Sequence, residues 1–331
     1  MRAEPDGLAA AAVVHALRLQ WSFDADAVEY AAVGGGSYHW VVSDATGRRA
    51  FVTVDDLDHK SWLGETRDAA FAGLRRAFDT AVALRESGLQ FVVAPLGTRD
   101  GASLVRLDAR YSVALFPFLE GEAGQFGRYG NDEDRRGVAA LLAELHRATA
   151  APSTVGFDLP GRRHLEAALA DRRTPWTCGP LSEPSRAAIN ESAGHLAELI
   201  ALADRFAADA QARSGGWVVS HGEPHAANVL RTACGQRLLD WDTVALGPPE
   251  RDLWLVVSDE SAAQEVYERA SGRRLDQTAL DFFRLTWDLK DLAEYLSVLR
   301  APHRENEDTL RHYRALTQVA AVRESWRSVL D

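Results

Sequence analysis

The chain has 331 residues, of which 46% are hydrophobic and 26% charged, and its formal net charge is −11 at pH 7. This length exceeds what one hydrophobic core usually supports, so two lobes are expected. The acidic balance argues against nucleic acid as a partner, because phosphate backbones require clustered Lys and Arg. It fits a cationic ligand, although many proteins are acidic for solubility alone.

No signal for export or for a membrane is found in the sequence. The apolar run at residues 8–17 is short and has no basic segment before it. No stretch approaches the roughly 18 apolar residues of a membrane span. The two cysteines, Cys178 and Cys234, form neither a disulfide framework nor a metal-ligand pattern. The sequence therefore predicts a cytoplasmic protein without a membrane partner.

The first 120 residues predict a small, mostly antiparallel sheet with one packed helix. The expected elements are a helix over 7–20, strands at 31–33, 38–42 and 49–54, a helix over 65–87, strands at 91–93 and 104–107, and an apolar run over 111–119.

The second half is mainly helical, with patterns over 132–149, 185–212, 260–270, 276–299 and 305–329. Two short apolar strands interrupt it and flank residues 221–240. The fold class is therefore α+β, with a nucleotide-binding lobe over residues 1–118 and a catalytic and acceptor-binding lobe over 119–331.

The motif that indicates chemistry begins at His221. His221-Gly222-Glu223 is followed by four residues and then Asn228. The catalytic loop of kinases has His-x-Asp, four residues and Asn, in which the acid accepts the hydroxyl proton and the Asn ligates Mg²⁺. Asp240 follows one hairpin later, where a second metal-binding carboxylate is expected, since Mg²⁺ prefers oxygen ligands.

The run from His221 to Asp252, including Leu239-Asp240-Trp241-Asp242 and 247–253, resembles the aminoglycoside phosphotransferase family. With Trp287-Asp288 included, the pattern is most similar to the spectinomycin-type enzymes. The resemblance implies a bilobal protein-kinase-like fold and transfer of the γ-phosphoryl group of ATP or GTP, with Mg²⁺, to a hydroxyl of a small molecule such as an aminocyclitol antibiotic. Glu223 and His221 would be catalytic, and Asn228 and Asp240 would hold the metal.

On the nucleotide side, the first hairpin contains Gly34, Gly35, Gly36 and Ser37, called the glycine turn below. Backbone N–H groups approach phosphates closely where no side chain intervenes. Phe118 and Leu119 lie where the two lobes should join, and in this fold the backbone of that linker binds the base.

Two positions depart from the family pattern. Thr53 stands where the third strand usually carries the phosphate-binding lysine. Lys60 or Arg67 could replace it, and Glu65 or Asp68 could supply the ion-pair partner on the following helix.

The second departure is Glu223, which replaces the usual Asp and is longer by one methylene. It indicates either a working base in an adjusted loop, with Pro224 setting the backbone back, or a weakened enzyme. We favour the working base, because Asn228, Asp240 and the glycine turn are retained.

Acceptor contacts are expected near the C-terminus, where acidic and aromatic residues recur at helical spacing: Trp287, Asp288, Asp291, Glu294 and Tyr295. Carboxylates and aromatic faces both attract ammonium groups. His225 is either an acceptor contact or a structural hydrogen-bonding residue. Asp242 is either an acceptor contact or a supporting acid. Asp252 is expected to brace the loop.

Three functions therefore compete. The first is an antibiotic O-phosphotransferase. The second is a metabolite kinase for a choline-like or sugar-like alcohol. The third is a nucleotide-binding pseudoenzyme, which the missing strand lysine and Glu223 make conceivable.

Overall fold

The computed structural model describes residues 4–5, 7–60, 62–127, 129–149, 156–213, 216–258 and 262–330. The chain divides into two compact units. The first comprises Met1–Thr154 and Trp217–Arg274, and the second Val155–Gly216 and Leu275–Asp331. The lobe boundary predicted between residues 118 and 119 falls inside the first unit and stays a prediction.

The first unit contains two sets of elements. Its N-terminal part contains α1 (Ala10–Trp21), β1 (Ala27–Tyr30), β2 (Tyr38–Ser43), β3 (Arg49–Asp56), η1 (Leu57–His59), α2 (Arg67–Glu86), β4 (Val105–Arg106), β5 (Tyr111–Pro117), β6 (Glu122–Ala123) and α3 (Asp132–Leu145). Its later part contains β7 (Val218–Ser220), η2 (Ala226–Asn228), β8 (Val229–Thr232), β9 (Gly235–Leu238), β10 (Ala245–Gly247), α7 (Glu250–Leu253) and α8 (Ala263–Ser271).

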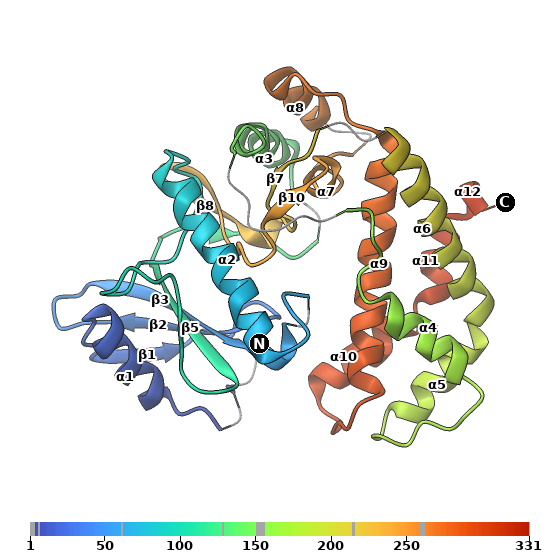
Figure 1. Ribbon diagram of the computed structural model, residues 1–331, viewed down its shortest axis with the longest axis horizontal. Coiled ribbons are helices and arrows are strands. Elements are labelled where there is room, and N and C mark those ends of the chain that lie inside the picture. The colour runs from blue at the N-terminus through green and yellow to red at the C-terminus, as the bar shows by residue number, and fades with distance from the viewer. Residues whose placement is uncertain are drawn as a thin grey trace. The chain divides into compact units, whose positions relative to one another are not determined.

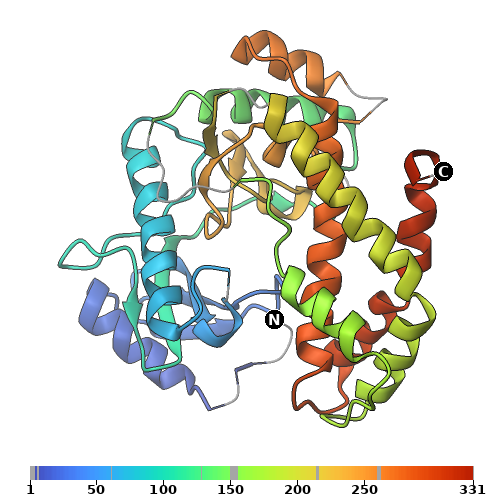
Figure 2. The same ribbon diagram turned by 45° about the vertical axis from the view of Figure 1, so that its right-hand side comes forward.

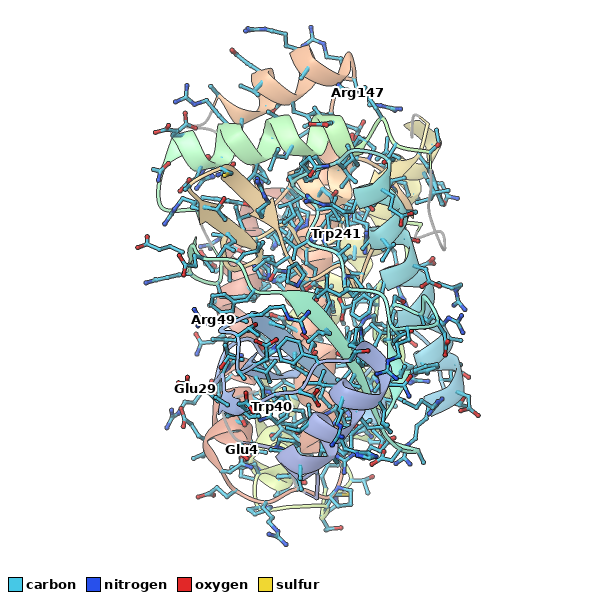
Figure 3. The ribbon with its side chains drawn as sticks, turned by 90° about the vertical axis from the view of Figure 1, so that its left-hand side faces the viewer. Glu4, Glu29, Trp40, Arg49, Arg147 and Trp241 are labelled. Carbon is cyan, nitrogen blue, oxygen red and sulfur yellow. The ribbon has the colours of Figure 1, made fainter. Side chains whose placement is uncertain are left out.

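A five-stranded sheet organises the N-terminal part, in the order β1-β2-β3-β5-β4 with every neighbouring pair antiparallel. Side chains on β5 alternate between its two faces. Val113 and Leu115 pack into a core with α1, whereas Ala114 and Phe116 pack against α2. Figure 1 shows these two helices on opposite sides of the sheet, and Figure 3 shows Trp40 within it. Period-two alternation thus gives the sheet two apolar faces.

Two strand predictions from the sequence are wrong: one strand lies at a different position, and the other does not form. The first strand lies at residues 27–30 and not at 31–33, because the Val33 N–H bonds back to the Ala31 carbonyl in a tight turn that leads into the glycine turn. Residues 91–93 form only a single bridge, Val92 with Leu238. They are buried in the core, and a three-residue apolar run does not distinguish burial from strand pairing.

Helix α2 also holds the segment that follows β3. The Thr66 side chain caps the helix by accepting the Ala69 N–H. A side chain at Gly73 of α2 would overlap the Leu63 backbone, so this glycine permits close approach of the segment after η1. The Leu63 N–H in turn bonds to the Lys60 carbonyl at 2.9 Å. This packing fixes Lys60 directly after η1.

The catalytic motif lies among two small antiparallel sheets, β10-β7 and β6-β8-β9. Helices α3 and α8 pack on one another nearby. Trp241, which is buried and labelled in Figure 3, donates its indole N–H to the Leu238 carbonyl at 2.9 Å. The loops that carry Glu223 and Asp240 therefore begin and end on paired strands.

The second unit is helical. It contains α4 (Arg162–Asp171), α5 (Ser182–Glu191), α6 (Ala193–Arg213), α9 (Gln277–Leu299), α10 (Glu307–Leu316), α11 (Val319–Ser325) and α12 (Arg327–Leu330). α9 is the central element, packed by α4, α6 and α10, and Figure 2 shows it beside α6. Across the described parts of the chain, no helix is long and apolar enough to cross a membrane.

Candidate active site

The predicted catalytic loop begins at strand β7. This strand pairs with β10, with Ser220 opposite Ala245, and all three of its residues are buried. A buried strand holds the loop that follows it in a defined position. Residues 221–228 therefore start from a fixed point.

Asp252 of α7 braces the start of the loop. Its carboxylate oxygens accept the backbone N–H of His221 at 2.8 Å and that of Gly222 at 2.6 Å. His146 Nε2 contacts the same carboxylate at 3.0 Å. Burial alone would raise the pKa of Asp252, but the hydrogen bond and charge of His146, and the Arg251 charge, lower it overall. The bracing role predicted for Asp252 is confirmed by these bonds.

Gly222 is required at its position for two reasons. Its φ of +100° lies in the region that favours glycine, and a side chain there would overlap the Arg251 guanidinium. Arg251 itself donates to Ser220 Oγ at 2.7 Å and to the Thr243 carbonyl at 2.9 Å. The loop thus turns sharply around a fixed arginine.

His221 is buried and bonded on both sides of its ring. Nε2 lies 2.8 Å from the Leu239 carbonyl, and Nδ1 accepts the Glu223 N–H at 3.3 Å. Burial, the largest influence, lowers the pKa of the ring. A neutral imidazole with Nε2–H donating satisfies both contacts. These contacts fix His221 against Glu223 and the Asp240 segment, and the catalytic role predicted for His221 stays a prediction.

The backbone around Glu223 is held by several bonds. Its carbonyl accepts the His225 N–H at 2.8 Å and Asn228 Nδ2 at 3.0 Å. The Tyr129 hydroxyl donates to the Pro224 carbonyl. Because the Asn228 amide nitrogen points at the Glu223 carbonyl, the Asn228 amide oxygen is directed away and can serve as a ligand. The Glu223 side chain is only partly buried.

Asp240 lies beside the end of the same loop, since the Leu239 N–H bonds to the Asn228 carbonyl at 2.8 Å. Its φ of +60° is rare for a residue with a side chain. Burial and the negative charges of Asp242 and Glu223 raise the pKa of the Asp240 carboxyl well above its ordinary value. The site thus has a surplus of negative charge that a bound cation would neutralise.

The donor set matches Mg²⁺ in kind, because Asn228 and Asp240 offer an amide and a carboxylate oxygen. Within the residues that the structure describes, no three His, Cys, Asp or Glu side chains are grouped so that they could hold a metal ion.

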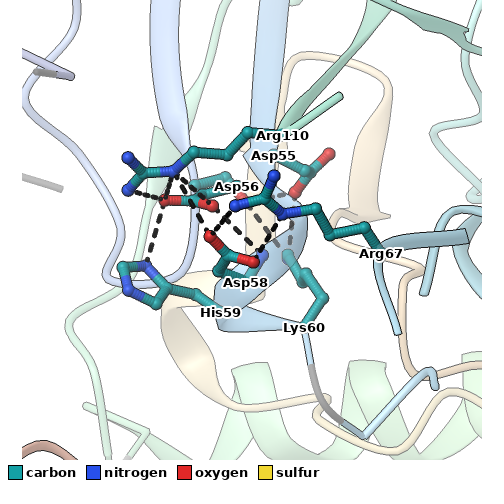
Figure 4. A network of polar contacts seen from close by, with 8 residues as sticks. Asp55, Asp56, Asp58, His59, Lys60, Arg67 and Arg110 are labelled. Atoms are coloured by element: carbon teal, nitrogen blue, oxygen red, sulfur yellow. Dashed lines mark hydrogen bonds and ion pairs between the residues drawn. The ribbon is translucent and has the colours of Figure 1, made fainter. Parts of the chain in front are cut away.

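Lys60 is completely enclosed, with a side-chain exposure of 2%. Its ammonium lies 2.7 Å from Asp242 Oδ2, 2.9 Å from Asp55 Oδ1 and 3.2 Å from Ser37 Oγ. Burial would lower the pKa of Lys60, but the charges of Asp242 and Asp55 more than offset it and raise the pKa. Lys60 therefore carries a buried positive charge (Figure 4).

Thr53, which stands where the family usually has the strand lysine, is an uncharged residue. Thr53 Oγ1 lies 3.2 Å from His39 Nδ1 on the neighbouring strand. Burial lowers the pKa of His39 to about 3. A Cβ at Gly36 would lie 3.9 Å from Lys60 Nζ, so the cation under the glycine turn is Lys60.

Arg67, the alternative replacement for the strand lysine, lies elsewhere. It makes two hydrogen bonds of 2.7 Å to Asp58 on the exposed surface (Figure 4). We therefore retain Lys60 as the phosphate-side cation.

The expected ion-pair partners on α2 are not the ones used. Asp68 bonds to Arg106 at 2.6 Å and is largely exposed, and Glu65 is also exposed. Lys60 pairs instead with Asp55, at the end of β3, and with Asp242.

The linker predicted to bind the base follows β5. The Arg49 guanidinium lies 3.6 Å from the centroid of the Phe118 ring, which fixes that side chain. Phe118 and Leu119 are both partly buried. Their contact with a nucleotide stays a prediction.

The residues predicted for acceptor binding fall into two groups. Asp242 and His225 belong to the first unit; Asp242 is bonded to Lys60, and His225 packs edge-on against Phe126 with centroids 4.8 Å apart. The other five lie on α9 of the second unit.

On α9, the acidic and aromatic residues differ in burial. Asp288 is partly buried, and this burial raises its pKa to about 6. The Tyr295 hydroxyl lies 3.5 Å from Asp291 Oδ2, and Trp287 lies under the Lys290 ammonium at 5.2 Å. Glu294 is exposed.

Sequence reasoning missed Asp55 and His146. Asp55 interrupts an apolar strand, which is a usable signal for a residue with a polar partner. His146 follows an amphipathic helix, and nothing in its sequence context indicates its bond to Asp252.

The sequence profile described as the phosphotransferase enzyme family matches residues 28–295. The Protein StrN of Streptomyces griseus is 30% identical over 279 residues, which cover 78% of this chain and 80% of that protein.

Solved structures with the same fold include kinases and phosphotransferases. The spectinomycin phosphotransferase APH(9)-Ia, in complex with ADP and spectinomycin, gives a TM-score of 0.71 at 15% identity and covers 96% of this chain and 99% of its own. An ethanolamine kinase of Plasmodium vivax gives 0.56 at 12% identity, covering 89% and 82%. The bilobal kinase-like α+β fold predicted from sequence is thereby confirmed.

Proposed function

The chain belongs to the phosphotransferase enzyme family, the small-molecule O-phosphotransferases that its sequence resembles, and on this premise we propose its reaction. It transfers the γ-phosphoryl group of ATP or GTP to a hydroxyl of an aminoglycoside or aminocyclitol such as spectinomycin. The main support for this proposal is the catalytic loop, which Asp252 braces and which holds Glu223 and Asn228 beside Asp240.

Glu223 is the base of this proposal. Hydrogen bonds hold its backbone N–H and its carbonyl, while the residue is partly exposed to solvent, where an acceptor could reach it. In the reaction its carboxylate orients the acceptor hydroxyl and receives the proton. Phosphoryl transfer depends mainly on positioning and charge neutralisation, so a fixed loop is the main requirement.

Asn228 and Asp240 would hold Mg²⁺, which when bound neutralises charge on the nucleotide phosphates. The surplus of carboxylates around Asp240 supports this, because an anionic triphosphate would otherwise be repelled. Lys60 supplies the protein's own positive charge on the same side. Asp242 holds Lys60, and we assign it to the nucleotide side and not to the acceptor.

The glycine turn, with Phe118 and Leu119 in the linker, would complete the nucleotide site. The acceptor would contact α9 through Trp287, Asp288 and Asp291, with Glu294 and Tyr295 beside them. Asp288 is the most suited to a cationic acceptor, because it is partly buried and makes no hydrogen bond or ion pair within the described part of the chain.

His225 stays a candidate acceptor contact in this proposal. No nucleic acid and no membrane take part, and the setting that we propose is the cytoplasm.

The test is a turnover assay of the purified chain with Mg²⁺ and either ATP or GTP. Acceptors would be spectinomycin, other aminocyclitols, choline and ethanolamine, and the phosphorylated product would be identified by mass spectrometry. Product from an aminocyclitol supports the proposal. Product only from choline or ethanolamine would assign a metabolite kinase, and nucleotide binding without product from any acceptor would indicate a pseudoenzyme.

A further inference from the structure

Asp55 lies where two parts of the nucleotide side meet. One oxygen of its carboxylate, Oδ1, accepts the Ser37 hydroxyl at 2.6 Å and lies 2.9 Å from Lys60 Nζ. Ser37 ends the glycine turn, and Lys60 follows β3. A single carboxylate therefore ties the turn to the lysine.

The ammonium of Lys60 depends on this arrangement. Lys60 Nζ donates hydrogen bonds to Asp242 and Ser37 and forms an ion pair with Asp55 at 2.9 Å. A buried charge without such partners is strongly disfavoured. Two hydrogen bonds and two ion pairs thus hold the Lys60 ammonium in place.

Asp55 is also the partner best placed to remain with Lys60 when a nucleotide binds. It belongs to the same strand-to-η1 segment as Lys60, only five positions earlier. Its second oxygen, Oδ2, is buried and has no hydrogen-bond partner in the described part of the chain. This oxygen is therefore available to accept an N–H of Lys60.

We propose that Asp55 is the positioning residue that holds the Lys60 ammonium beneath the glycine turn for contact with the nucleotide phosphates. This inference rests on the proposed function, because it requires that a nucleoside triphosphate is the phosphoryl donor. Asp55, on β3, would therefore be the ion-pair partner of the lysine that was expected on the following helix.

Asp56 provides a matched control. It is the next residue on β3, it is equally buried at 1% exposure, and it pairs with Arg110 at 2.6 Å. Its side chain points to the other side of the strand, as Figure 4 shows. Asp56→Asn therefore removes a partly buried ion pair from the same strand without touching Lys60.

The experiment compares the binding of a nucleoside triphosphate and of its nucleoside to the full chain by titration calorimetry. Asp55→Asn should weaken triphosphate binding about 10- to 100-fold, the usual effect of losing a charged hydrogen bond, and leave nucleoside binding unchanged. Asp56→Asn should lower the melting temperature and leave both affinities unchanged. In a Lys60→Met background, Asp55→Asn should cause no further loss of triphosphate affinity.

Ser37→Ala removes one bond of the cluster and keeps both charges, so it reports even where Asp55→Asn does not fold. It should weaken triphosphate binding by a smaller factor, again without effect on the nucleoside. Equal triphosphate affinities for the wild type and for every Asp55 and Ser37 variant would overturn the inference. A wild type that binds the triphosphate no better than the nucleoside would instead overturn the proposed function.

Discussion

The ammonium of Lys60 lies 2.7 Å from the carboxylate of Asp242, although 182 positions separate the two residues in the chain. The same lysine contacts Asp55 and Ser37 from the glycine-turn side. The buried ammonium of Lys60 therefore links β3, through Asp55, to the segment that carries Asp240, through Asp242. In the function that we propose, this lysine, seven positions after Thr53, takes the place of the strand lysine.

Glu223→Asp tests whether the loop is built around the longer side chain. Restoring the residue that kinases usually have should lower kcat about 100-fold, because the fixed backbone leaves the shorter carboxylate roughly 1 Å from its position. Nucleotide affinity should not change. Steady-state kinetics with the best acceptor measures the effect, with Glu223→Gln as the variant expected to lose nearly all turnover. Equal or higher kcat for Glu223→Asp would show that the loop is not adjusted to glutamate.

Asp252→Asn should reduce both stability and turnover. The amide keeps one acceptor oxygen but loses the charge that faces His146 and two backbone N–H groups. Breaking such a buried pair costs about 3 kcal/mol or more. Urea unfolding measures the loss, and kcat should fall more than the nucleotide KM rises. As a comparison, Asp58→Asn removes an exposed pair with Arg67 and should change stability by less than about 1 kcal/mol.

Stability should decrease as the pH falls below about 6.5. Burial lowers the pKa of His39 to about 3 in the folded protein. Between about pH 6.5 and pH 3, His39 is therefore protonated in the unfolded chain and neutral in the folded chain. The contribution of neutral His39 is fully present above the unfolded pKa and is lost as the pH falls toward 3, at up to about 1.4 kcal/mol per pH unit.

Urea unfolding at pH 7 and pH 5 would measure this slope. His39→Gln should have a shallower pH dependence than the wild type. His15→Gln, at an exposed position of α1, should keep the wild-type slope. The same slope in all three proteins would remove His39 as its origin.

Recognition of a cationic acceptor should improve as the pH rises through about 6. Burial raises the pKa of Asp288 to that value, so its carboxylate is fully charged only above it. The acceptor KM should fall across this range for an acceptor that keeps its ammonium charge, and the nucleotide KM should not follow it. Asp288→Asn should abolish the trend and Glu294→Gln, at an exposed position, should retain it. A wild-type acceptor KM that is flat with pH would count against Asp288.

The sequence by itself determined the family and the fold class of this protein. The spacing of His221, Glu223 and Asn228 lies within eight residues, so short-range geometry fixes it once the flanking strands form. Helix α9 was predicted within one residue of its observed ends, because its apolar period and its Asp276 cap are local signals.

Only the tertiary structure decided which carboxylates pair with Lys60. Many aspartates precede α2, and any of them could pair with Lys60 by composition. The choice of Asp55 follows from strand alternation, which turns Asp55 and Asp56 to opposite faces, and from Gly73, which lets the Lys60 segment lie close against α2. The pairing with Asp242 depends on how segments 182 positions apart pack together, and no local pattern encodes that packing.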